Sequence, residues 1–108
     1  MSAPSEAIAN AVRGEASIRV AGETLVLRPS FAALVAAERE LGPLFALVER
    51  VAEGRLALSE LVALFWHCLR ERPAALTREM LGEAVTTGGL TAGMPALRML
   101  LGQILAGR

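Results

Sequence analysis

The chain has 108 residues, of which 54% are hydrophobic, and its 11 basic residues balance 11 acidic residues. This length fits a single domain, and a net charge of zero without a run of basic residues argues against nucleic-acid binding. No stretch reaches the ~18 uninterrupted apolar residues of a membrane-spanning helix, so we expect no membrane partner.

The start of the chain differs from the rest. Residues 1–13 are small and polar with no strong period, and we expect a flexible N-terminal arm there. They carry Glu6 and no long apolar run, so they do not form a secretory signal. We expect a single α+β domain over residues 14–108.

A β-hairpin is predicted over residues 15–28. Apolar and polar residues alternate from Ala16 to Val20, which is typical of a half-buried strand. Ala21-Gly22 fits a two-residue turn because glycine accepts a positive φ. This turn places Ile18 opposite Leu25 and Ala16 opposite Leu27, so that apolar residues share one face.

A bundle of four to five short α-helices follows the hairpin. Ser30 and Thr77 are good N-caps, and Gly42 is a natural stop for the first helix. Pro95 is tolerated only in a first turn, so the last helix can begin nearer Gly93. The predicted helices cover about 31–41, 43–53, 58–72, 77–87 and 90–106.

The helix predicted over 58–72 is apolar on most sides, and only a narrow polar stripe that includes His67 faces solvent. Such a helix is normally central in the fold or shared with a partner. Trp66 allows the same two interpretations, a core position or a place in an interface. The high apolar content also allows two interpretations. Either alanines lie on exposed helix faces, or apolar surface is left outside the core.

No constellation of reactive residues appears. His67 and Cys68 are neighbours on a predicted helix, so their side chains diverge and cannot form a nucleophile–base pair. With one histidine, one cysteine and no aspartate, no zinc-ligand spacing exists. The glutamate pairs indicate solvated helix surface. We therefore expect no enzyme activity, no catalytic residue, no cofactor and no metal. A single cysteine also suits a reducing cytoplasm.

The segment 14–42 carries a pattern that resembles a known family. A short hairpin is followed by Leu-Arg-x-Ser/Thr-Phe-x-Ala-Leu, then a glutamate, then Leu-Gly. The matching residues are Leu27, Arg28, Ser30, Phe31, Ala33, Leu34, Glu38, Leu41 and Gly42. This pattern resembles the gene transfer agent and phage tail assembly chaperone family, whose members are labelled both as tail tube and as tail assembly chaperone proteins. Residues 51–61 look similar too, although a helix-capping serine common near Ala57 is missing.

Within that pattern we expect structural roles. Leu27, Phe31 and Leu34 are predicted to join the hairpin to the first helix. Glu38 is predicted to reach an arginine or the hairpin backbone. The family has no catalytic residues to carry over to this sequence.

The resemblance implies a chaperone in the bacterial cytoplasm that holds the tape-measure protein, and works with the tail tube protein, while the tail is built. It also implies a homo-oligomer. An apolar groove for a helical partner requires apolar helix faces, and the candidate contacts are Phe65, Trp66, Leu69, Leu97, Leu101 and Ile104. Two alternatives stay open: a structural tail tube or connector subunit whose hairpin edges pair between copies, and an unrelated small helical adaptor.

Overall fold

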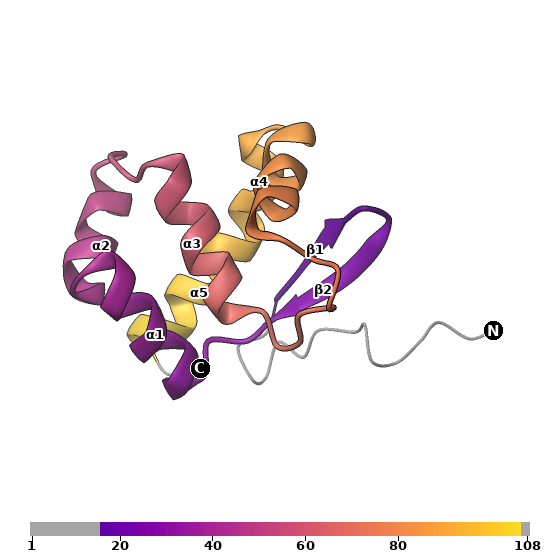
Figure 1. The fold of residues 1–108 in the computed structure, drawn as a ribbon. Coiled ribbons are helices and arrows are strands. Elements are labelled where there is room, and N and C mark those ends of the chain that lie inside the picture. The colour runs from indigo at the N-terminus through magenta and orange to yellow at the C-terminus, as the bar shows by residue number, and fades with distance from the viewer. Residues whose placement is uncertain (1–15, 107–108) are drawn as a thin grey trace.

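The structure, a computed structural model, describes residues 16–106 and has the predicted α+β architecture (Figure 1). Strands β1 (Ala16–Val20) and β2 (Glu23–Leu27) form an antiparallel hairpin. The helices are α1 (Phe31–Leu41), α2 (Leu44–Ala52), α3 (Leu58–Cys68), α4 (Arg78–Thr87), the 3₁₀ turn η3 (Leu90–Gly93) and α5 (Met94–Ala106). The arm expected over residues 1–13 lies outside the described residues.

The hairpin has the predicted register, with Ile18 opposite Leu25 and Ala16 opposite Leu27. Ala21 and Gly22 both have positive φ, 52° and 85°, which matches the right-handed twist of the strands in a two-residue turn. Arg19 stabilises this turn because its guanidinium donates to the Gly22 carbonyl at 2.9 Å and to the Thr24 hydroxyl at 3.0 Å.

The predicted end of α3 at residue 72 is wrong, because the helix ends at Cys68. The backbone beyond it pairs with the outer edge of β2 instead. Leu69 forms a bridge with Leu27, and the Arg70 N–H donates to the Val26 carbonyl at 2.8 Å. The Arg28 N–H donates back to the Cys68 carbonyl at 2.6 Å. These strand-like bonds replace the helical bonds that residues 69–72 would have made.

Helix α1 spans the predicted residues, but two of its side chains lie elsewhere than expected. The Ser30 hydroxyl caps the helix by accepting from the Ala33 N–H, and Gly42 ends it with a φ of 88°. Phe31 does not join the hairpin to α1, because its side chain is 85% exposed. Glu38 does not reach the hairpin either, since its carboxylate accepts from the Leu44 N–H at 3.0 Å and so caps α2.

The remaining helices lie close to their predicted ranges. Glu60 replaces the missing capping serine of α3, because its carboxylate accepts from the Ala57 N–H at 2.9 Å. The same carboxylate pairs with Arg50, which ties α2 to α3. Thr77 caps α4 as predicted. The last predicted helix is divided into η3 and α5, and Pro95 lies in the first turn of α5, where its missing N–H costs nothing.

One core joins the hairpin to the helices, with α3 in the middle of the molecule. Figure 1 shows α1 and α2 on one side of α3, α4 and the hairpin on the other, and α5 behind. Burial of these apolar side chains is the main term that stabilises the fold. The largest fully buried side chains are Phe65, Leu27, Leu47, Leu64, Leu81, Leu100 and Cys68.

Candidate interaction surfaces

The predicted partner contacts divide into two groups in this structure. Phe65, Leu69 and Leu97 belong to the core and are covered by the chain's own side chains. Trp66, Leu101 and Ile104 are half-buried and reach the surface. Contact between a partner and the first three stays a prediction, and it would require the core to open.

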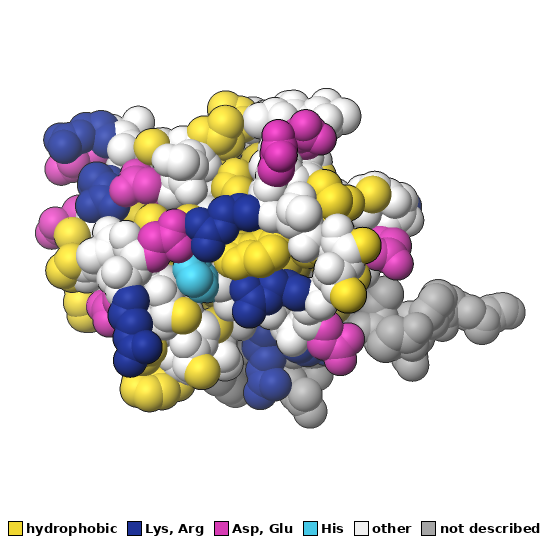
Figure 2. All heavy atoms as spheres, in the orientation of Figure 1, with side chains coloured by type: hydrophobic (Ala, Val, Ile, Leu, Met, Phe, Trp, Pro, Cys, Tyr) yellow, Lys and Arg dark blue, Asp and Glu magenta, His cyan; other side chains and the backbone are white. Residues whose placement is uncertain are grey.

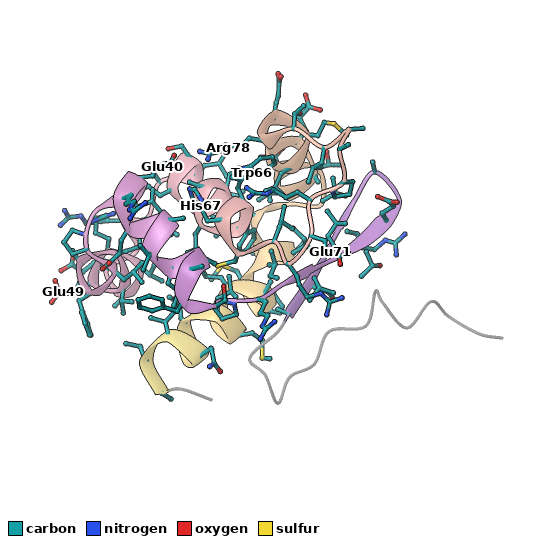
Figure 3. The ribbon with its side chains drawn as sticks, turned by 60° about the horizontal axis from the view of Figure 1, so that its bottom comes forward. Glu40, Glu49, Trp66, His67, Glu71 and Arg78 are labelled. Atoms are coloured by element: carbon teal, nitrogen blue, oxygen red, sulfur yellow. The ribbon has the colours of Figure 1, made fainter. Side chains whose placement is uncertain are left out.

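The structure leaves a different set of apolar side chains in solvent. Phe31 is 85% exposed, Phe45 is 79% exposed and Leu105 is 57% exposed. These residues come from α1, α2 and the end of α5, which lie on the same side of the molecule in Figures 1 and 3. We call these three residues the aromatic side. Figure 2 shows yellow side chains along its left and lower left edge, where α1 and α2 lie.

Sequence reasoning did not select the aromatic side. For Phe45 a signal existed, because Leu44, Leu47 and Val51 recur at helical spacing and Phe45 lies off that apolar stripe. Phe31 was expected to join the hairpin to α1, but it is the first residue after the N-cap and its side chain is exposed. Leu58 and Leu90 are the other exposed large apolar residues among those described.

A second surface is centred on Trp66, whose ring contacts two arginines. Figure 3 labels Trp66 and one of the two, Arg78. The guanidinium carbon of Arg72 lies 4.9 Å from the ring centroid, and that of Arg78 lies 5.7 Å from it. Both distances are within the range of cation–π attraction. Trp66 is therefore half-buried: it packs against the core and its ring also contacts two arginines.

Glu40 of α1 links α3 and α4 beside Trp66. Its two carboxylate oxygens bind the His67 Nε2 atom at 2.8 Å and the Arg78 Nη1 atom at 2.6 Å. The hydrogen bonds from Arg78 and then from His67 lower the pKa of Glu40 from 4.5 to about 2. These residues come from α1, α3 and α4, 27 and 38 positions apart in sequence, so no local pattern could have revealed them.

An open hollow of about 290 Å³ lies beside this cluster. Arginines Arg28, Arg70 and Arg72 line it, together with His67 and small side chains of α1. Figure 2 shows dark blue side chains gathered next to the cyan His67 on this face. We call the surface formed by Trp66, Arg78 and the three arginines of the hollow the Trp66 face.

A larger open hollow of about 490 Å³ lies between the hairpin turn and α4. Its lining includes Val20, Met80 and Thr87, with Arg19 and Glu83 as the charged groups. The smaller hollow is lined by both Ser30 and His67, but the Ser30 hydroxyl caps α1 and the His67 Nε2 atom is bonded to Glu40. Cys68 lies in the core, and burial raises the pKa of its thiol to about 12.

Two further features of residues 16–106 bear on possible sites. No group of three or more histidine, cysteine or acidic side chains there is arranged to hold a metal ion. No helix in that range has the length and hydropathy needed to cross a membrane.

The fold and these surfaces define a small, mostly helical protein whose exposed features fit contacts with other proteins. A family model described as "Phage tail tube protein, GTA-gp10" matches residues 13–107, so the chain belongs to that family. The suspected relationship to gene transfer agent and phage tail proteins is thus confirmed. No curated protein and no solved structure matches the chain.

Membership of a tail family gives the chain a role in building or forming a phage-like tail. It implies contact with other tail components and association with the particle or with the cell that assembles it.

Proposed function

We propose that the chain is a tail assembly chaperone that binds the tape-measure protein while the tail tube forms around it. The observation that carries this proposal is the aromatic side, where two phenyl rings lie almost wholly in solvent. Aromatic residues are enriched in protein interfaces and contribute much of their binding energy. A tape-measure protein is long and helical, and its apolar helix faces would aggregate before assembly unless another protein binds them.

The same proposal includes the absence of catalysis and a place of action in the bacterial cytoplasm. The chain also self-associates, because an exposed apolar side serves a second copy as well as a helical partner. Light scattering of the purified chain measures this self-association over a range of concentrations.

Co-expression with the tape-measure protein of the same particle tests the proposal. Phe31→Ser and Phe45→Ser together should weaken co-purification by at least about tenfold, because each buried phenyl ring contributes roughly 1.5–3 kcal/mol. Leu90→Ser removes an exposed apolar side chain from η3, away from the aromatic side, and should leave co-purification unchanged. Equal binding by wild type and the double variant would contradict the proposal.

A structural tail tube subunit is the second candidate, and it is favoured by the description of the family as a tail tube protein. One feature of the fold suits it, because β1 pairs only with β2 among residues 16–106, and a strand with a single strand partner can pair with a strand of another copy. The outer edge of β2 is already occupied by residues 68–70. The two candidates differ in whether the chain remains in the finished particle.

A further inference from the structure

We propose that the Trp66 face binds a segment of a partner protein that is rich in glutamate and aspartate, with Arg72 making the first contact. This inference rests on the proposed function only in taking the partner to be a tail protein. The Trp66 face adjoins the aromatic side at the start of α1 but shares no residue with it, so different variants test the two proposals.

Arg72 is suited to this contact because its charge has no carboxylate partner among residues 16–106, while its guanidinium is held against Trp66. A guanidinium that stacks on an aromatic ring keeps its N–H groups directed outward in the plane of the fork. That fork matches the two oxygens of a carboxylate. Arg78 is different, since it already binds Glu40.

The hollow beside Arg72 extends the same chemistry. Three arginines and His67 line it, and no carboxylate is among the described residues of its lining. Arg28 and Arg70 already take part in interactions of their own, so we do not assign the first contact to them. Three alanines of α1 also line the hollow, and their small side chains leave room for an incoming chain. The nearby N-terminus of α1 adds partial positive charge.

Carboxylates fit this face better than nucleic acid does. The Trp66 ring, which could have stacked on a base, already contacts two guanidinium groups. The chain as a whole has a net charge of zero, whereas phosphate binding normally depends on an excess of basic charge. Glu71 is the one carboxylate of residues 69–77, and it is exposed with an arginine on each side in sequence.

A peptide titration of the full chain tests the inference. The probe is a short fluorescein-labelled glutamate-rich peptide, compared with the same peptide carrying glutamine and with a labelled single-stranded oligonucleotide. Anisotropy of the label gives the affinity. Emission of Trp66, the only tryptophan, reports whether binding occurs at this face.

We expect the glutamate peptide to bind and change Trp66 emission, and Arg72→Gln to weaken binding about tenfold, as expected for the loss of one charge-assisted contact. Arg98→Gln removes the same charge from an exposed site on α5 and should have little effect. The affinity of Arg72→Lys for the peptide should lie between those of wild type and Arg72→Gln, because lysine keeps the charge and lacks the forked guanidinium. Far-UV circular dichroism confirms that each variant is folded.

Three outcomes would overturn the inference: no binding of the glutamate peptide, equal weakening by Arg72→Gln and Arg98→Gln, or tighter binding of the oligonucleotide. If the peptide fails while the tape-measure protein still co-purifies, this face is wrong and the proposed function stands. If the peptide binds while the tape-measure protein does not co-purify, the proposed function is wrong and the assignment of this face stands.

Discussion

Neighbouring residues on α3 have different surroundings, and Phe65 and Trp66 illustrate this most clearly. Phe65 is fully buried in the core, whereas Trp66 lies at the surface between arginines. A helix turns by about 100° per residue, so two adjacent aromatic side chains cannot share one environment. Removing each ring should therefore have different effects.

We expect Phe65→Ala to lower the free energy of unfolding by about 3–5 kcal/mol, since it leaves a cavity in the core. Trp66→Ala should cost about half as much, because the ring is only half-buried and its arginine contacts are exposed. Urea denaturation followed by far-UV circular dichroism measures both. If Trp66→Ala alone unfolded the chain, Trp66 would be a core residue and not part of a binding face.

Glu40 makes stability depend on pH in a defined direction. Its pKa of about 2 in the folded chain lies below the ordinary value of 4.5. The stabilisation is therefore complete above pH 4.5 and is lost as the pH falls from 4.5 towards 2. Because the carboxylate is 40% exposed, solvent screening reduces its contribution to about 1 kcal/mol.

Glu40→Gln should accordingly lower the free energy of unfolding at neutral pH. The difference from wild type should decrease as the pH falls from 4.5 towards 2. Thermal unfolding of wild type and variant across this pH range measures the difference. Glu49→Gln is the matched control, since Glu49 is an exposed glutamate of α2 with no side-chain hydrogen bond among residues 16–106. A difference between wild type and Glu40→Gln that stayed constant with pH would contradict the assigned cause.

Among the elements, the hairpin turn carries visible backbone strain. Ala21 has a φ of 52°, a left-handed conformation that costs an ordinary residue roughly 1–2 kcal/mol. Asparagine tolerates this conformation, and Asn-Gly is a preferred pair for such a turn.

We expect Ala21→Asn to raise the free energy of unfolding by about 0.5–1 kcal/mol. Gly22→Ala should act in the opposite direction, because the φ of Gly22 is 85° and an added Cβ is strained there even though it meets no neighbouring atom. Denaturant unfolding measures the free energy of unfolding of both variants against wild type. A loss of stability in Ala21→Asn would mean that the turn differs from the one described.

Elements specified by local signals were predictable from the sequence. The hairpin register followed from alternation around Ala21-Gly22, and the bounds of α1 followed from Ser30 and Gly42. The end of α3 was not predictable, because residues 69 and 70 leave the helix to pair with a strand more than 40 positions earlier. The contacts of Glu40 and the exposure of Phe31 likewise depend on how distant helices pack.

At the scale of the whole molecule, one core holds the hairpin and helices together, and we propose that two surfaces bind other proteins. The aromatic side exposes apolar side chains, and the Trp66 face carries arginines. A chaperone that must hold a partner and then release it benefits from contacts of both kinds, since the ionic part weakens with salt and the apolar part does not.

The chain's presence in finished particles tests the central claim most directly. Quantitative mass spectrometry of purified particles compares its copy number with that of the subunits that form the tail tube. We predict that the chain is abundant in the assembling cells and absent, or present far below the tube subunits, in the particles. A copy number equal to that of the tube subunits would contradict the chaperone proposal and identify the chain as part of the tail itself.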